Sequence, residues 1–202
     1  MRIMAIYTYG NRIAKGLIHL HESQEKIIHR DLHSKKILVH DGRMMIADFG
    51  ISKEWTNQMT TRGDTDPGVH AYMDTKYLAN HKYQRDEKSV VFSFGVLLWE
   101  ISSGRPPFAS CTSRDEVIFK IFNQMREAPV EGTPKEYIDL YTHCWDEEPS
   151  NRPIIQEAFE ILQHLSEGND ESESREHLKL PSHEAPSTNS DESELSSEAH
   201  SD

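Results

Sequence analysis

The sequence predicts an α+β fold that is mostly helical and carries one small β-hairpin. Apolar residues recur at helical spacing in several segments, one segment is apolar on nearly every side, and one Asp-Gly pair joins two short β-prone runs. With 202 residues, of which 36% are hydrophobic, the chain can fill one hydrophobic core. We therefore expect a single globular domain followed by a tail.

The first predicted elements are a helix and the hairpin. In residues 5–21 the apolar side chains follow one another at spacings of three and four, which is typical of an amphipathic helix. The runs 37–40 and 43–47 are rich in apolar and β-branched residues, and Asp41-Gly42 between them is a pair favoured in tight type I′ turns. These segments predict a helix followed by a β-hairpin.

The second half of the predicted domain is helical. Residues 52–69 are rich in Thr, Asp and Gly without periodicity, which favours a long functional loop that becomes ordered on demand. Residues 90–101 are apolar almost all the way round, and a helix with this pattern is buried on all sides. Further helical patterns cover residues 114–125, 134–144 and 153–165.

The negative charge of the chain is concentrated at its C-terminal end. The formal net charge is −12, and residues 166–202 hold 11 acidic and 2 basic residues, which leaves 23 acidic and 20 basic residues in 1–165. The Ser-, Glu- and Asp-rich composition of 166–202 predicts a disordered acidic tail. Because an acidic chain repels nucleic-acid phosphates and anionic lipids, we expect protein partners and neither nucleic acid nor membrane.

Cysteine usage and hydropathy indicate the compartment. Cys111 and Cys144 lie outside any C-x-x-C motif, which argues against a disulfide framework and against a zinc site. The apolar stretches are shorter than the ~20 residues of a membrane span, and residues 1–12 lack the apolar region of a secretory signal. We expect a cytoplasmic or nuclear protein that is not secreted.

Two motifs carry the functional signal. His29-Arg30-Asp31-Leu32 follows the first predicted helix, and Asp48-Phe49-Gly50 follows the hairpin, so that the second aspartate comes seventeen residues after the first. In this order and spacing the motifs resemble those of the protein kinase superfamily. The resemblance covers residues 9–165 and implies the C-terminal lobe of the kinase fold. Ser34, Cys144-Trp145 and the run Pro149-x-x-Arg152-Pro153 are similar to the tyrosine-kinase-like group of Ser/Thr kinases.

The resemblance implies a role for each motif residue. Asp31 would accept the proton of the substrate hydroxyl, and Asp48 would bind Mg²⁺ on the ATP phosphates. His29 would pack beneath the phenylalanine of the second motif, and Arg30 would pair with a phosphorylated loop. Leu38 would form the floor of the adenine site. ATP and Mg²⁺ are the implied cofactors, and a protein is the implied substrate or partner.

Three positions depart from the family pattern. Lys36 stands where the family has an asparagine that ligates Mg²⁺; an ammonium cannot ligate a cation, although it can contact a nucleotide phosphate. Val90 replaces an aspartate that accepts hydrogen bonds from the catalytic-loop backbone, which predicts a less rigidly held loop. Lys76 replaces the glutamate that pairs with Arg152, and Asp74 is the candidate replacement.

The parts that cover and clamp ATP in the family have no counterpart before the first predicted helix. Neither a Gly-rich loop nor a strand lysine with its partner glutamate fits into those few residues. We therefore expect residues 1–165 to be a partial kinase domain without the N-terminal lobe, followed by the tail over 166–202. The surface around Leu38 would then be exposed and apolar.

Several hypotheses of function remain open. The first is ATP-dependent phosphoryl transfer to protein Ser/Thr, weak or absent in this chain because of Lys36 and the absent lobe. Tyr also stays open as acceptor, since His33 stands where many Ser/Thr kinases place a lysine. The second is a pseudokinase-like module that binds a protein partner through the helices of residues 114–165. The third is a degenerate gene fragment or an incomplete gene model.

Overall fold

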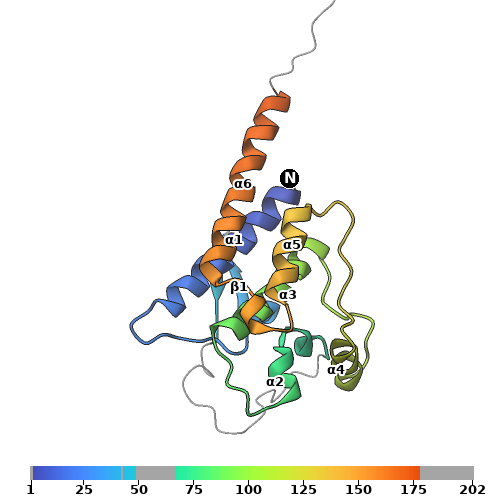
Figure 1. Ribbon diagram of the computed structural model, residues 1–202. Helices are drawn as coiled ribbons and strands as arrows, with labels where there is room; N and C mark the ends of the chain where they lie inside the picture. The colour runs from blue at the N-terminus through green and yellow to red at the C-terminus, as the bar shows by residue number, and fades with distance from the viewer. Residues whose placement is uncertain (1, 42, 49–66, 178–202) are drawn as a thin grey trace, which may run out of the picture.

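The computed structural model describes residues 2–41, 43–48 and 67–177, which form a mainly helical body from which one long helix projects (Figure 1). The predicted fold class is confirmed: in these residues the only sheet is a two-stranded antiparallel hairpin. In chain order the elements are α1 (Arg2–His21), η1 (Ser34–Lys36), β1 (Ile37–His40), β2 (Arg43–Ile46), η2 (Pro67–Tyr72), α2 (Thr75–Ala79), α3 (Glu87–Ser103), α4 (Arg114–Phe122), α5 (Lys135–Cys144), η3 (Pro149–Asn151) and α6 (Ile155–His177), where η denotes a 3₁₀ helix.

Helix α3 is the centre of the hydrophobic core. The Asp86 side chain caps its first turn, and Gly104, with a φ of 69°, ends it in the left-handed region. Helices α1 and α5 pack against it. At Gly95 an added Cβ would lie 2.7 Å from the Cβ atom of Cys144, so the glycine lets α5 approach closely. The prediction of a buried helix over residues 90–101 is confirmed, and the helix extends further at both ends.

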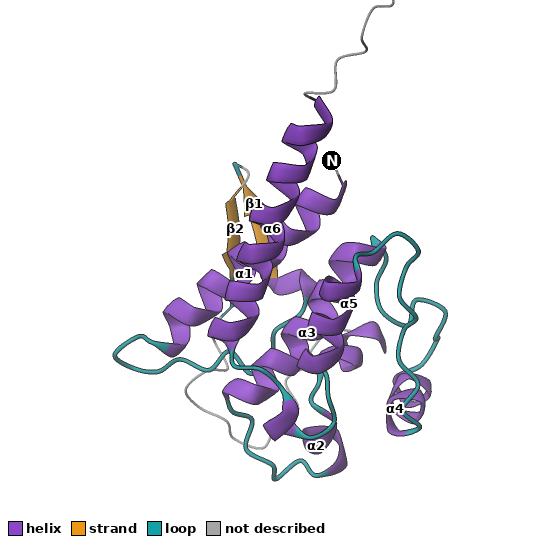
Figure 2. Ribbon diagram, turned by 45° about the horizontal axis from the view of Figure 1, so that its top comes forward, coloured by secondary structure: helices purple, strands orange, loops and turns teal. Residues whose placement is uncertain are grey.

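Helices α1 and α6 lie along each other and close one side of the core (Figure 2). Gly10 of α1 permits this contact, since an added Cβ would lie 2.7 Å from Leu98 Cδ2 and 3.1 Å from Leu162 Cδ1. The apolar face predicted for α1 is the buried one, because Ile13 and Leu17 are almost completely buried. Sequence periodicity therefore identified both the helix and the side that packs.

The expectation of a disordered chain from residue 166 onward was wrong for residues 166–177, which are helical. Helix α6 continues without a break to His177, beyond its last predicted residue. Residues 166–177 include four glutamates and one arginine, which favour the helical backbone, so a helix that starts on the core can continue after its apolar face has ended. The remaining part of the expected tail, residues 178–202, lies outside the described residues.

The hairpin lies where the sequence predicts it. Ile37 of β1 lies opposite Ile46 of β2, and Asp41 between the strands has a φ of 48°. This left-handed conformation suits a tight hairpin turn. On α1, an added Cβ at Gly16 would lie 3.0 Å from Ile46 Cδ1, so the hairpin packs directly beneath this helix.

The remaining elements follow the predicted pattern with shifted ends. Helix α4 ends at Phe122 instead of residue 125, and α5 begins one residue after Pro134. Most of the loop predicted over 52–69 lies outside the described residues, while its last part belongs to the 3₁₀ helix η2. Among the described residues, no helix combines the length and the hydropathy that a membrane crossing requires.

Candidate active site

His29 ties the first motif to the strand that leads into the second. Its imidazole is almost completely buried, and Nε2 lies 3.1 Å from the carbonyl oxygen of Ala47, next to Asp48. Its Nδ1 atom lies 3.4 Å from the backbone nitrogen of Asp31. Because that N–H can only donate, Nδ1 accepts and Nε2–H donates, which is a neutral tautomer. Burial lowers the pKa of His29, consistent with this neutral ring. The expected contact with Phe49 lies outside the described residues.

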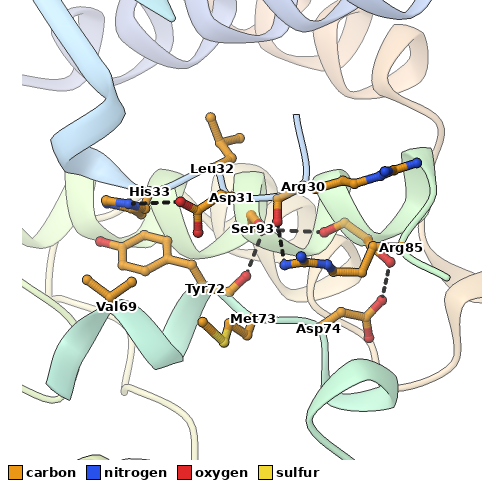
Figure 3. A pocket seen from close by; sticks show the side chains of 11 residues that line it. Arg30, Asp31, Leu32, His33, Val69, Tyr72, Met73, Asp74, Arg85 and Ser93 are labelled. Carbon is orange, nitrogen blue, oxygen red and sulfur yellow. Dashed lines mark hydrogen bonds and ion pairs between the residues drawn. The ribbon is translucent and has the colours of Figure 1, made fainter. Parts of the chain in front are cut away.

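Asp31 lies at a small pocket between η2 and residues 28–34, the segment that the resemblance identifies as the catalytic loop (Figure 3). Its Oδ2 atom is 3.9 Å from His33 Nε2, and 17% of its side chain is exposed. On the other wall of the pocket the Tyr72 hydroxyl lies 3.4 Å from Ser34 Oγ. The carboxylate is therefore accessible from solvent and can accept a proton from a hydroxyl that enters the pocket.

Lys36 and Asp48 form an ion pair at the base of the hairpin. Lys36 Nζ donates to Asp48 Oδ2, and the side chains are 21% and 52% exposed. The backbone brings the two residues together, because the N–H of Ala47 donates to the carbonyl oxygen of Lys36 at 2.8 Å. Asp48 itself has a φ of 65°, in the left-handed region. The charge of the second-motif aspartate is thus compensated from within the chain.

A second arginine supports the catalytic loop. Arg30 adopts a φ of 58°, and its carbonyl oxygen accepts a hydrogen bond from Nη1 of Arg85. The Arg85 guanidinium also stacks over the Tyr77 ring, 4.3 Å from its centroid. Val90, which lies where an acceptor was expected, is buried in the core instead. The loop is therefore held by a side-chain donor from the α2–α3 connection.

Asp74 replaces the expected glutamate partner of Arg152. The guanidinium donates to both carboxylate oxygens, at 2.8 and 3.0 Å, and both side chains are completely buried. Ser89 Oγ donates to the same carboxylate at 2.7 Å. Lys76, at the family's glutamate position, forms its own ion pair with Glu148 at 2.9 Å near the surface. The buried pair is thus preserved with a partner two positions earlier in the chain.

A known protein family matches most of this chain. The family model described as protein tyrosine and serine/threonine kinase matches residues 1–162. This chain belongs to the protein kinase family. The predicted family is thus confirmed, and the mainly helical fold with one hairpin agrees with a C-terminal kinase lobe.

Similar proteins are protein kinases by name. The probable serine/threonine-protein kinase drkA of Dictyostelium discoideum is 34% identical over 154 residues, which cover 75% of this kinase chain and 23% of that protein. The mitogen-activated protein kinase kinase kinase 7 of Homo sapiens is 32% identical over 156 residues, covering 75% of this chain and 25% of its own. The chain spans about a quarter of the length of these relatives. The names agree with the predicted tyrosine-kinase-like group.

The kinase family generally uses ATP and Mg²⁺, and the described residues fit the metal poorly. Asp48 has the carboxylate oxygens that Mg²⁺ prefers, but its Oδ2 is engaged by Lys36. The ammonium offers no lone pair to a metal. Among the described residues, no group of three His, Cys, Asp or Glu side chains is placed to hold a metal ion. Leu38 is half exposed on the hairpin, so its side chain is accessible to a nucleotide.

The structure brings together most of the site residues that the sequence predicts. Asp31 and His29 share the catalytic loop, and the His29 contact with Ala47 joins this loop to the segment that holds Asp48. Arg85 was missed, because nothing in the sequence around it marks a contact with the catalytic loop. The sequence offered one indirect signal. Val90 lacks the carboxylate that accepts hydrogen bonds from the catalytic loop in the family, so another side chain had to hold this loop.

Proposed function

We propose that this kinase domain transfers phosphate from ATP to Ser or Thr of a protein substrate, at a low rate, with Asp31 as the general base. The observation that carries this proposal is the double hydrogen bond of His29. It fixes the Asp31 backbone on one side and the Ala47 carbonyl on the other, so that both aspartate segments are held together. Phosphoryl transfer depends mainly on such positioning.

In this mechanism the protein supplies positioning and a proton acceptor. The hydroxyl of the substrate enters the pocket beside η2, and the Asp31 carboxylate accepts its proton as the hydroxyl oxygen bonds to the γ-phosphorus of ATP. The bond between that phosphorus and the bridging oxygen of ADP breaks, and ADP leaves. His33, 3.9 Å from Asp31, lines the same pocket and can contact the substrate. Leu38 offers an exposed apolar side chain on which an adenine ring can rest. Mg²⁺ neutralises the charge of the phosphates in other members of this family, whereas here the positive charge beside Asp48 is the Lys36 ammonium.

A low rate follows from the departure at Lys36. The asparagine of the family contributes a metal ligand, whereas the ammonium contributes a positive charge beside the metal position. If the lack of a metal held at this position costs about 3 kcal/mol in the transition state, transfer slows by roughly a hundredfold. The proposal therefore predicts transfer that is measurable above background but slow.

The proposal is tested by phosphate transfer from labelled ATP to a generic Ser/Thr protein substrate. The variants are Asp31→Asn and, as a matched control, Asp41→Asn, which changes an exposed acid in the hairpin turn. We expect slow transfer by the wild type and the control, and none by Asp31→Asn. Transfer that persists in Asp31→Asn would exclude Asp31 as the base. No transfer by any of them would favour the second candidate below.

The second candidate is a binding module that recognises a protein without transferring phosphate. The hairpin favours it, because Leu38 and Met45 lie opposite each other and are both about half exposed, and the neighbouring Val39 is 65% exposed. Exposed apolar clusters of this kind commonly bind protein. A photo-crosslinker at position 39 should trap one protein. Unlabelled wild type should compete for it, and a Leu38→Ser/Met45→Ser variant should not.

A further inference from the structure

At Asp48, the Lys36 ammonium takes the place that Mg²⁺ has in the kinase family. In the described structure the positive charge beside the Asp48 carboxylate is the ammonium of Lys36. It is monovalent, covalently attached to the chain, and present at any concentration of metal. A divalent ion at the same carboxylate would have to displace this ammonium or remain close to it, and like charges repel strongly at contact distance.

Backbone hydrogen bonds hold Lys36 and Asp48 close to each other. Lys36 ends the 3₁₀ helix η1, where its N–H donates to the carbonyl oxygen of His33 at 2.9 Å. Its carbonyl oxygen accepts the bond from Ala47, the residue before Asp48. Hydrogen bonds therefore hold the backbone of Lys36 and the backbone next to Asp48. Because the two backbone segments are held close together, the pair loses less conformational freedom on forming than most surface ion pairs do.

We propose that Lys36 is a resident cation that closes Asp48 to divalent metal ions. The negative charge of Asp48 is thereby neutralised by an ammonium instead of Mg²⁺. The Asp48 carboxylate then does not bind Mg²⁺ or Mn²⁺ when these ions are present at millimolar concentration. The inference rests on the proposed function only in taking Asp48 as a residue of the nucleotide site. It extends that function by naming the cation beside Asp48, which is the Lys36 ammonium of the same chain.

Hard divalent ions also lack further ligands here. Mg²⁺ requires near-octahedral coordination by oxygen and is usually held by carboxylates, with water and phosphate completing the shell. Asp48 is the carboxylate that the hairpin base contributes, and position 36 contributes an ammonium in place of an amide oxygen. Replacing Lys36 by Asn removes the repelling charge and adds an oxygen ligand in one step. This substitution therefore reverses the cation preference of the site.

The test measures Mn²⁺ binding to the full chain without nucleotide or substrate, by the electron paramagnetic resonance signal of free Mn²⁺. Because residues 166–202 hold 11 acidic residues, a background of weak binding is expected, and the comparison with Asp48→Asn removes it. Wild type and Asp48→Asn should bind Mn²⁺ equally. Lys36→Asn should bind at least about tenfold more tightly than wild type, and the double variant Lys36→Asn/Asp48→Asn should lose this gain.

Lys35→Asn is the matched control, because it makes the same charge change at the preceding, exposed position and should show no gain. Weaker Mn²⁺ binding by Asp48→Asn than by wild type would overturn the proposal, as would a folded Lys36→Asn chain without a new site. If Lys36→Asn does not fold, Lys36→Gln offers the same ligand, and the comparison of wild type with Asp48→Asn still decides. A chain that fails to transfer phosphate leaves these outcomes unaffected.

Discussion

Arg152 and Asp74 form a completely buried, bidentate ion pair that joins the start of α2 to the segment before α6. The family places the acidic partner two positions later, where this chain has Lys76. Lys76, which stands at the family's glutamate position, forms an ion pair with Glu148 instead. A buried guanidinium requires a carboxylate close by, but the carboxylate can come from a neighbouring position of the same turn.

Removing the charge of Asp74 should strongly destabilise the fold. Asp74→Asn keeps the cap that accepts from Lys76 N–H, but leaves Arg152 buried without a compensating charge. We expect the free energy of unfolding to fall by about 3 kcal/mol. Urea unfolding followed by circular dichroism measures this change. As a control, Glu148→Gln removes the acid of an exposed pair and should leave the midpoint nearly unchanged.

Arg85 should act as a positioning residue for the catalytic loop. In Arg85→Gln the bond to the Arg30 carbonyl is lost, and the left-handed backbone at Arg30 is no longer held from outside the loop. We expect faster amide hydrogen exchange in residues 28–34, with exchange in α3 unchanged. Lys82→Gln, an exposed charge on the same connection, is the control. Equal protection of the loop in both variants would show that Arg85 does not hold it.

Gly95 should tolerate no side chain. In Gly95→Ala the new Cβ would meet Cys144 Cβ at 2.7 Å and the carbonyl oxygen of Tyr141 at 2.9 Å, so α5 must move. Although alanine favours helices, we expect a net loss of about 1–3 kcal/mol of stability. Gly168→Ala in α6 is the opposite case, because no atom lies within 4 Å of its Cβ. There the midpoint of urea unfolding should rise slightly instead of falling.

Acid should destabilise the fold through buried histidines. Burial lowers the pKa of His21 and of His29 below the value of 6.5 that holds in the unfolded chain. Below pH 6.5 the unfolded state therefore binds more protons than the folded state, and stability decreases as the pH falls. The free energy of unfolding measured from pH 7.5 to 5 should decline in this way. His21→Phe, at a site with both ring nitrogens buried and unbonded, should reduce the slope. An unchanged slope would contradict this assignment.

The sequence predicted the helices and the hairpin because each has a local pattern. The apolar run of residues 90–101 can only be buried, and Asp41-Gly42 closes a turn whatever surrounds it. The end of α6 was misplaced because helix propensity continues past the last apolar residue, and composition alone marked Ser166 as the start of disorder. Local signals locate elements well and their ends poorly.

By itself, the sequence predicted the kinase family, Asp31 as the candidate base, and the three positions that depart from the family pattern. Which residues compensate for those departures was decided by tertiary structure. Asp74 could be named in advance as a candidate partner of Arg152, but only the folded chain places both in one buried site. The contact of Lys36 with Asp48 depends on the path of the backbone. A sequence records which charges exist, whereas Coulomb energy depends on their distance and burial, which only the fold sets.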